Sequence, residues 1–318
     1  MEDIHTEKPK RTVALDCSTS HFPMAFHRTY KARKKAGDLV ELILEDNEGI
    51  SRCVTTSPFR LPSVFDRRIE LVLLAEAQRI GKRVVEFDSL YALIRAVGRE
   101  NPTEVYYQMA KNALILLEHT SRYFDGIKRP QKQVQAIKQS LKEAGKKGWK
   151  DVPEREPFRV NKVIESLEYE DGPIRVTLNR DLVRMHSRDG GNQIAEIDLD
   201  VIARLNSPAA LNLYTYLMAY PYEAQRKQPL SVQTLTRVCA WPNAEMPRHR
   251  LEAELKKTLE KISKVTGTTY NVERTHNKTY RITSLEPVQQ EKVRPELAPA
   301  NDDTGVKFPP RHRVRLVA

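Results

Sequence analysis

The clearest hydrophobic pattern in the chain lies in residues 245–264. Its apolar positions recur every three or four residues: Leu251, Leu255, Leu259 and Ile262. Side chains at this spacing share one face of an α-helix, and such a face must pack against a core. Pro247 falls in the first turn, where a proline is tolerated. The pattern predicts a long amphipathic helix whose opposite face is free.

The segments around this helix follow one another in the order of a winged-helix domain. Asp198, Ser207 and Ser231 each precede an apolar segment and predict the N-caps of three further helices. Four runs have the character of short strands: residues 194–197, 228–230, 269–274 and 279–284. We expect residues 193–285 to form one winged-helix domain whose last two strands are the wing.

The first half of the chain follows the same order less regularly. Its expected elements are a hairpin over 39–55, a helix over 64–80, a strand over 83–87 and helices over 89–97 and 102–118. We expect the strand 121–124 to complete a winged helix-turn-helix, and we interpret the hairpin 160–178 as a long wing. Residues 38–187 are thus expected to form the first domain, with a basic insert at 125–158.

The two ends of the chain have a different composition. Residues 1–37 carry many lysines and arginines and little apolar content, so we expect a basic arm that packs poorly by itself. Residues 286–318 are proline-rich and mixed in charge, which predicts a disordered tail. The fold class is therefore expected to be α+β, with two tandem winged-helix domains and flexible N- and C-terminal tails.

The charge balance narrows the class of partner. The chain has 53 Lys+Arg against 42 Asp+Glu, a net charge of +11. Such an excess attracts polyanions, with nucleic acid the first candidate, although ribosomal and membrane-surface proteins share it. Three scattered cysteines predict neither a disulfide framework nor a zinc site. With no long apolar run and no signal-peptide pattern, we expect a cytoplasmic protein without a membrane partner.

The polar face of the long helix holds the candidate DNA contacts. Arg248, His249 and Arg250 lie near its N-terminal end, the end of a recognition helix that normally enters the major groove. Arginine can bond guanine O6 and N7, while lysine more often holds phosphate. The further candidates of this domain are Arg237, Lys256, Lys257, Arg274 and Lys278. A solvated helix face is the alternative, but residues 225–281 hold twelve Lys/Arg against five Glu, which favours binding.

The first domain offers fewer candidates. In the helix 102–118, Tyr107, Gln108 and Lys111 lie outside an apolar set that includes Val105, Met109, Ala113 and Leu116. The tyrosine is as compatible with a core position as with a contact. Lys128 and Arg129 begin the basic insert, where residues 125–162 hold eleven Lys/Arg against five Asp/Glu. The insert can hold phosphate or act as a mobile linker, and both interpretations stay open.

Catalytic patterns are missing from the sequence. Gly81 and Lys82 resemble the end of a phosphate-binding loop, but the glycine required five positions earlier is Glu76. The eight histidines form no HxH or HxxxH pair, and Asp198 with Asp200 is more simply a helix cap than a metal pair. We expect no enzyme activity, no cofactor and no metal.

Three stretches resemble the iteron-binding plasmid replication initiators, most closely the RepC-type initiators of IncQ-like plasmids. They are IDLDVIARLNSPAALNLYTYLMAY, LSVQTLTRVCAWP and the closing TYRITS, with the basic helix between the last two. The resemblance is best over residues 194–282. The resemblance implies binding of double-stranded DNA at direct repeats of an origin, opening of an A+T-rich segment and recruitment of a replicative helicase. A homodimer is possible, and the resemblance does not decide whether one forms.

Two other classes of protein remain as alternatives. A winged-helix transcriptional repressor would use the same architecture, since one fold hosts many functions. A non-specific basic scaffold or RNA-binding protein would use the same charge. Two tandem domains with separate basic patches favour an initiator that contacts extended repeats.

Overall fold

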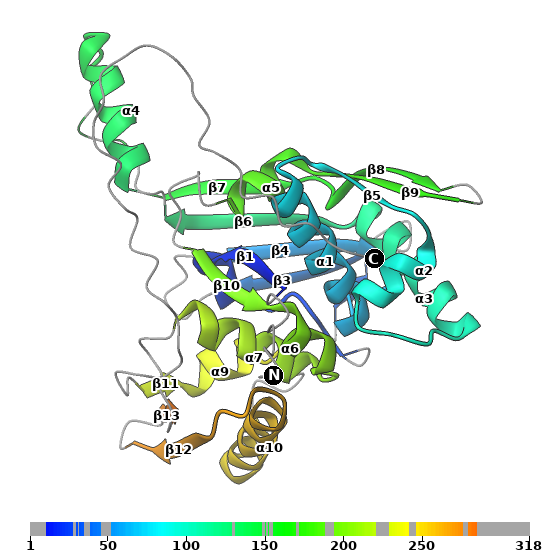
Figure 1. Cartoon of the computed structure of the whole chain (residues 1–318). Helices are drawn as coiled ribbons and strands as arrows, with labels where there is room; N and C mark the ends of the chain where they lie inside the picture. Colours follow the sequence, from blue (N-terminus) through cyan, green and yellow to red (C-terminus); the bar gives the residue numbers. More distant parts are fainter. Residues whose placement is uncertain are drawn as a thin grey trace, which may run out of the picture. The chain divides into compact units, whose positions relative to one another are not determined.

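The computed structural model describes residues 11–27, 30, 32–34, 39–45, 52–128, 131–147, 150, 152, 155–169, 172–187, 194–220, 229–241, 246–275 and 279–284. Residues 1–287 form one compact unit. Helices and antiparallel sheets alternate within it, so the expected α+β class is confirmed (Figure 1). The tail expected at 286–318 lies outside the described residues.

The C-terminal part of this unit, here called the second module, has the expected element order. It contains α6 (Leu199–Arg204), α7 (Pro208–Ala219), β11 (Pro229–Ser231), α9 (Val232–Val238), α10 (Arg248–Thr266), β12 (Tyr270–Arg274) and β13 (Thr279–Ser284). The three strands form an antiparallel sheet in the order β11-β13-β12. The expected long helix is α10, and β12 and β13 are the expected hairpin.

Local sequence sets the ends of these helices. Ser231 caps α9, because its Oγ accepts a hydrogen bond from the Thr234 amide at 3.0 Å. Helix α10 ends at Gly267, whose φ of 75° is the left-handed conformation that glycine adopts without strain. The apolar stripe of α10 is buried as expected: Leu251, Leu255, Leu259 and Ile262. Its polar face is therefore turned away from the core.

The first module uses the same kinds of element with an interruption. It contains α1 (Val64–Ile80), β5 (Val84–Phe87), α2 (Leu90–Ala96), α3 (Glu104–His119), β8 (Ile164–Tyr169), β9 (Ile174–Leu178) and α5 (Arg180–Met185). Its sheet has the order β5-β9-β8. The expectation that the strand at 121–124 completes this sheet is wrong, because β8 takes that place.

The strand at 121–124 instead belongs to a separate five-stranded antiparallel sheet. This sheet consists of β2 (Arg33–Lys34), β3 (Leu39–Glu45), β4 (Arg52–Pro58), β6 (Ser121–Lys128) and β7 (Arg155–Val160), paired in that order. Between β6 and β7 the chain forms α4 (Gln131–Glu143), which Figure 1 shows extending beyond the ends of these strands. Part of the basic insert thus forms regular structure. The two strands that flank α4 are anchored in the core by Phe124 of β6 and Val160 of β7, which are buried.

The basic-arm expectation for residues 1–37 is wrong for residues 12–26. These residues form β1 (Thr12–Asp16) and the 3-10 helix η1 (Cys17–His21), followed by an extended segment. Strand β1 pairs antiparallel with β10 (Ile194–Asp198), and the side chains of Val13, Leu15 and Phe22 are buried. The local charge count missed this packing because the apolar partners lie far away in sequence.

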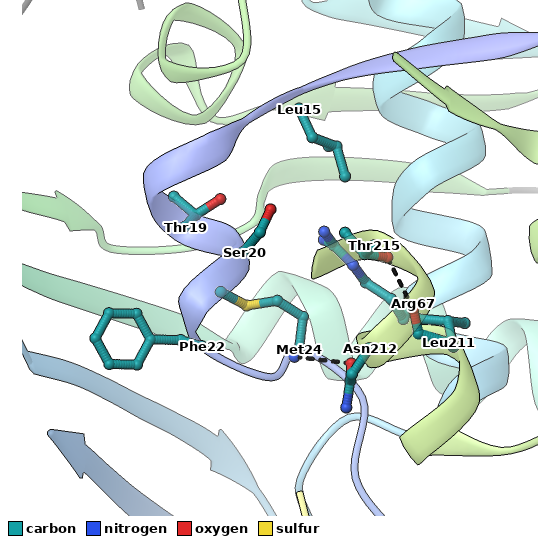
Figure 2. A pocket seen from close by; sticks show the side chains of 9 residues that line it. All are labelled: Leu15, Thr19, Ser20, Phe22, Met24, Arg67, Leu211, Asn212 and Thr215. Atoms are coloured by element: carbon teal, nitrogen blue, oxygen red, sulfur yellow. Dashed lines mark hydrogen bonds between the residues drawn. The ribbon is translucent and has the colours of Figure 1, made fainter. Parts of the chain in front are cut away.

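Residues 12–26, here called the strap, hydrogen-bond to helices of both modules. Gln78 of α1 accepts from the Ala14 amide and donates to its carbonyl, both at 2.9 Å. Asn212 of α7 accepts from the Ala25 amide at 3.2 Å and donates to its carbonyl at 2.7 Å. A cavity lies among the strap, α1 and α7 (Figure 2). Its volume of about 10 Å³ is about the room that one water needs.

The modules also meet directly at Arg68 of α1. Its guanidinium is buried and donates to the carbonyl oxygens of Ile202 at 3.0 Å and Leu205 at 2.9 Å. It also donates to Asn206 Oδ1 at 2.9 Å. The two backbone carbonyls lie at the C-terminal end of α6, where the helix dipole favours a cation. The two modules are therefore held together by specific polar contacts as well as by the strap.

A buried charged cluster lies beneath the strap. Glu70 of α1 bonds Arg67 at 2.7 Å and accepts two hydrogen bonds from Arg122 of β6. Burial alone would raise the pKa of Glu70, but the charges of Arg122 and Arg67 outweigh it and lower the pKa to about 2. Glu70 therefore stays ionised inside the protein and neutralises part of the arginine charge.

His186 gives the fold a specific pH dependence. Burial first, and then the charge of Arg67, lower its pKa from 6.5 to about 3, and its Nδ1 accepts from the Asp16 amide at 2.9 Å. The unfolded chain takes up this proton near pH 6.5 and the folded chain only near pH 3. The free energy of unfolding therefore falls with acidification across this window, by about 1.4 kcal/mol per pH unit from this group.

Urea unfolding at pH 7 and at pH 5 measures how far the free energy of unfolding falls between the two. We expect this decrease to be about 2 kcal/mol smaller in the His186→Asn variant than in the wild-type protein. Asparagine keeps an acceptor for the Asp16 amide but does not titrate. An equal loss in both proteins would refute the role of His186.

Candidate nucleic-acid interface

Helix α10 presents a basic surface opposite its buried stripe. In its first turn Arg248, His249 and Arg250 are exposed, and Lys256 and Lys257 are exposed further along. No side chain of these five forms a hydrogen bond or ion pair with another residue among those the structure describes. As far as the described part of the chain shows, their donors are open to an external acceptor.

Three exposed arginines of the first module have carboxylate partners. Arg175 lies 3.1 Å from Glu86, and Arg79 and Arg83 each have a carboxylate partner in Glu76 and Glu165. Helix α10 itself carries acidic residues, but its first-turn arginines do not pair with them within the described residues. The N-terminal end of α10 is therefore one place where positive charge is not paired within the described residues.

The hairpin lies beside this end of the helix. Tyr280 of β13 is buried and donates its hydroxyl to Glu252 Oε1 of α10 at 3.1 Å. Burial and Glu252 raise the pKa of Tyr280, whereas the charges of Arg274 and Arg248 act in the opposite direction. Arg274 at the end of β12 and Arg248 at the start of α10 thus contribute charge to one region. The hairpin and the helix can contact one polyanion together.

Two further lysines on α10 escaped the sequence analysis. Lys261 and Lys264 are exposed like Lys257. Their spacing of four and three residues places them on the same side of the helix. That spacing was a usable signal, and it extends the positive surface along the length of α10.

Arg237 does not belong to this surface. It is half-buried on α9, donates from Nη1 to the Glu45 carbonyl at 3.2 Å and lies over the Phe22 ring at 5.9 Å. The guanidinium is held against the strap and β3, so the structure does not bring Arg237 together with the exposed cations of α10. Lys278 and Arg129 lie outside the described residues, as does the side chain of Lys128.

The candidates on α3 are only partly available. Tyr107 is half-buried against the core, Gln108 donates to Asn112 Oδ1 at 3.0 Å, and Lys111 Nζ lies 5.5 Å from the centre of the Tyr169 ring. The structure therefore brings no set of free cations together on this helix within the described residues.

The apolar set expected on α3 is right for Ala113 and Leu116, which are buried, and wrong for Val105 and Met109. Val105 is 65% and Met109 38% exposed. The core is instead built from a neighbouring stripe: Ala110, Ala113, Leu114 and Leu117. Both stripes have helical spacing, so periodicity alone could not choose between them.

Membrane spans and metal sites are two other features that a basic protein can carry. No helix of the described chain is long and apolar enough to cross a membrane. Across the described ranges, no group of three or more His, Cys, Asp or Glu side chains is arranged to hold a metal ion.

Three solved structures are among those that are similar to this chain. Two are crystal structures of domains 2 and 3 of RctB, at 13% and 12% identity, covering 84% and 83% of this chain and 97% and 95% of theirs, with TM-scores of 0.48 and 0.45. The third is the Pi initiator protein in complex with iteron DNA, at 13% identity, covering 69% of this chain and 92% of that one, with a TM-score of 0.40. No protein-family model matches the chain, and no curated protein matches it.

Proposed function

We propose that the chain is a sequence-specific double-stranded DNA-binding protein built from two tandem winged-helix domains, residues 38–187 and 193–285. The observation that carries the proposal is the orientation of α10. Its leucines are buried, while Arg248 and Arg250 are exposed at the N-terminal end without partners among the described residues. In helix-turn-helix proteins that end contacts base edges in the major groove.

The remaining charges of the second module suit the DNA backbone. Lys256, Lys257, Lys261 and Lys264 extend along α10, and Arg274 lies on the hairpin. Lysine contacts to phosphate position a protein without selecting a sequence, whereas arginine can select guanine. For each phosphate neutralised, the slope of the logarithm of the binding constant against the logarithm of the salt concentration becomes more negative by about 0.9. We infer a division of labour in which the first turn selects the sequence and the lysines supply affinity.

Within this class, we propose a replication initiator of the RepC type that binds direct repeats at a plasmid origin. Opening of an adjacent A+T-rich segment and recruitment of a helicase complete the proposed function. The two modules support it, because one chain with two DNA-binding domains can contact an extended repeat. The fixed contacts of Arg68 and the strap would hold the modules in register on such a site.

Footprinting with a permanganate probe tests this function. The DNA used is the replication origin of the plasmid that encodes the protein. On it we expect protection of an array of direct repeats and reactivity of thymines in an adjacent A+T-rich segment. Protection of one palindrome near a promoter without thymine reactivity would instead assign a transcriptional repressor.

A further inference from the structure

Two arginines meet at the boundary between the modules without an acidic partner among the described residues. Arg68 of α1 and Arg99 of the turn between α2 and α3 both donate to Asn206 Oδ1, each from Nη2, at 2.9 and 3.4 Å. Glu100 and Glu104 follow Arg99 in the chain and are exposed, but within the described residues neither forms an ion pair with it. The three residues Arg68, Arg99 and Asn206 are here called the arginine junction. One neutral amide oxygen thus accepts hydrogen bonds from two cations.

The two positive charges of the arginine junction lie close enough to affect each other. Burial first, and then the charge of Arg99, lower the pKa of Arg68 to about 10. Elsewhere in the same fold a pair of buried arginines shares a carboxylate, because Glu70 bonds both Arg67 and Arg122. The arginine junction has the two cations of such a cluster and, among the residues that the structure describes, no carboxylate. An external anion would stabilise this arrangement.

The surroundings of the arginine junction also favour an anion. Arg99 Nε is buried and has no hydrogen-bond partner among the described residues. The Arg99 guanidinium lies 5.0 Å from the centre of the Tyr106 ring, a contact that positions the cation without neutralising it. Helix α7 begins at Pro208, its first turn contains no acidic residue, and the side chain of its N-cap, Ser207, makes no capping hydrogen bond. The positive end of the α7 dipole therefore lies directly after Asn206 in the chain.

The backbone fixes the two arginines in their positions. Gly98 has a φ of 89°, a conformation that favours glycine, and a Cβ added there would lie 2.5 Å from the Cβ of Ala203 on α6. The turn that carries Arg99 is therefore in direct contact with α6. Arg68 is held at the C-terminal end of the same helix by the carbonyls of Ile202 and Leu205. Such preorganisation lowers the entropic cost of binding a ligand.

We propose that the arginine junction binds a phosphate group. Arginine suits phosphate because its planar guanidinium offers paired donors. Asn206 is exposed and Arg99 is half-buried, so the group can approach from solvent. The phosphate can belong to the DNA backbone or to a free phosphate compound. The first source rests on the proposed function, since Arg99 lies in the turn of a helix-turn-helix, a motif that contacts the backbone.

Thermal unfolding of the full chain tests binding of free phosphate. Inorganic phosphate is compared with potassium chloride at equal ionic strength, in Arg99→Gln and in the matched control Arg95→Gln. Arg95 is an exposed arginine of α2 that likewise lies over a tyrosine ring, 5.8 Å from the centre of Tyr91. We expect phosphate to raise the unfolding midpoint of the control by about 2–4 °C more than that of Arg99→Gln. General effects of phosphate on stability act equally on both variants.

The salt dependence of binding to one duplex tests the DNA backbone as the source. We expect the slope of the logarithm of the binding constant against the logarithm of the salt concentration to become less negative by about 0.9 in Arg99→Gln, because one phosphate contact is lost. The slope of Arg95→Gln should stay that of the wild-type protein. If only the response to inorganic phosphate depends on Arg99, the ligand is a free phosphate compound.

The Asn206→Asp variant tests the arginine junction without removing an arginine. It keeps the acceptor oxygen and supplies a carboxylate to both cations. We expect its unfolding midpoint in chloride to rise by about 2–4 °C and its specific response to phosphate to disappear. An unchanged response to phosphate in this variant would contradict the proposal.

The proposal would also be overturned if Arg99→Gln and Arg95→Gln showed the same response to phosphate and the same salt slope. Sequence selection through Arg248 and Arg250 would survive that result, because these residues lie on α10. Conversely, a response to inorganic phosphate that depends on Arg99 would survive a failure to select any DNA sequence. The failure of this inference is therefore distinguishable from failure of the proposed function.

Discussion

Replacing Arg248 and Arg250 together with alanine is expected to remove most of the preference for the cognate DNA sequence while leaving non-specific binding largely intact. Each arginine that contacts a guanine contributes about 1–3 kcal/mol of discrimination. The double variant should therefore lose at least about tenfold in the ratio of specific to non-specific affinity. Non-specific affinity should persist, because Lys256 and Lys257 remain to bind phosphate.

A competition gel-shift assay at fixed salt concentration measures this ratio. The matched control is Arg180→Ala with Arg184→Ala, which removes two exposed arginines one helical turn apart on α5. We expect the control to retain its discrimination. If the α10 variant loses affinity for all duplexes equally, the arginines hold the backbone, and sequence reading through α10 is refuted.

Replacing Glu70 with alanine is expected to lower the free energy of unfolding by about 3–5 kcal/mol, because it leaves Arg67 and Arg122 buried without their shared carboxylate. All three side chains are nearly inaccessible to water. Glu70 thus stabilises the fold by neutralising the two buried arginines. The expected decrease is a large part of the free energy of unfolding of a typical protein.

Urea denaturation at pH 7 followed by circular dichroism measures the change. Glu76→Ala is the matched control on the same helix, since it breaks an i,i+3 pair with the exposed Arg79. Pairs exposed to solvent contribute about 0–1 kcal/mol, so the control should unfold close to the wild-type protein. A Glu70→Ala protein as stable as the control would show that the buried cluster is not needed to stabilise the fold.

The second module could be predicted largely from sequence because its signals are local. The stripe of α10 and the cap at Ser231 each depend on residues a few positions apart, and the pairing of β12 with β13 follows from a short hairpin. The exposed first turn of α10 followed from the buried stripe. Local periodicity thus predicted the candidate interface as well as the helix.

The expectations that failed depend on contacts between distant residues. Strand β1 is buried because β10, more than 170 positions away in sequence, pairs with it. The contacts of Arg237 with Glu45 and Phe22, which set it apart from the cations of α10, are likewise distant in sequence. On α3 two apolar stripes competed, and packing in the first module selected the one that leaves Val105 exposed. Composition and periodicity contain no information about such tertiary partners.

The central claim is that α10 reads a DNA sequence through its exposed first turn. Selection of bound fragments from a random duplex library tests it most directly, with the wild-type chain and the Arg248→Ala, Arg250→Ala variant selected side by side. We expect the wild-type protein to enrich one motif containing guanines and the variant to lose preference at those positions. Recovery of a library without any enriched motif by the wild-type protein would contradict the claim.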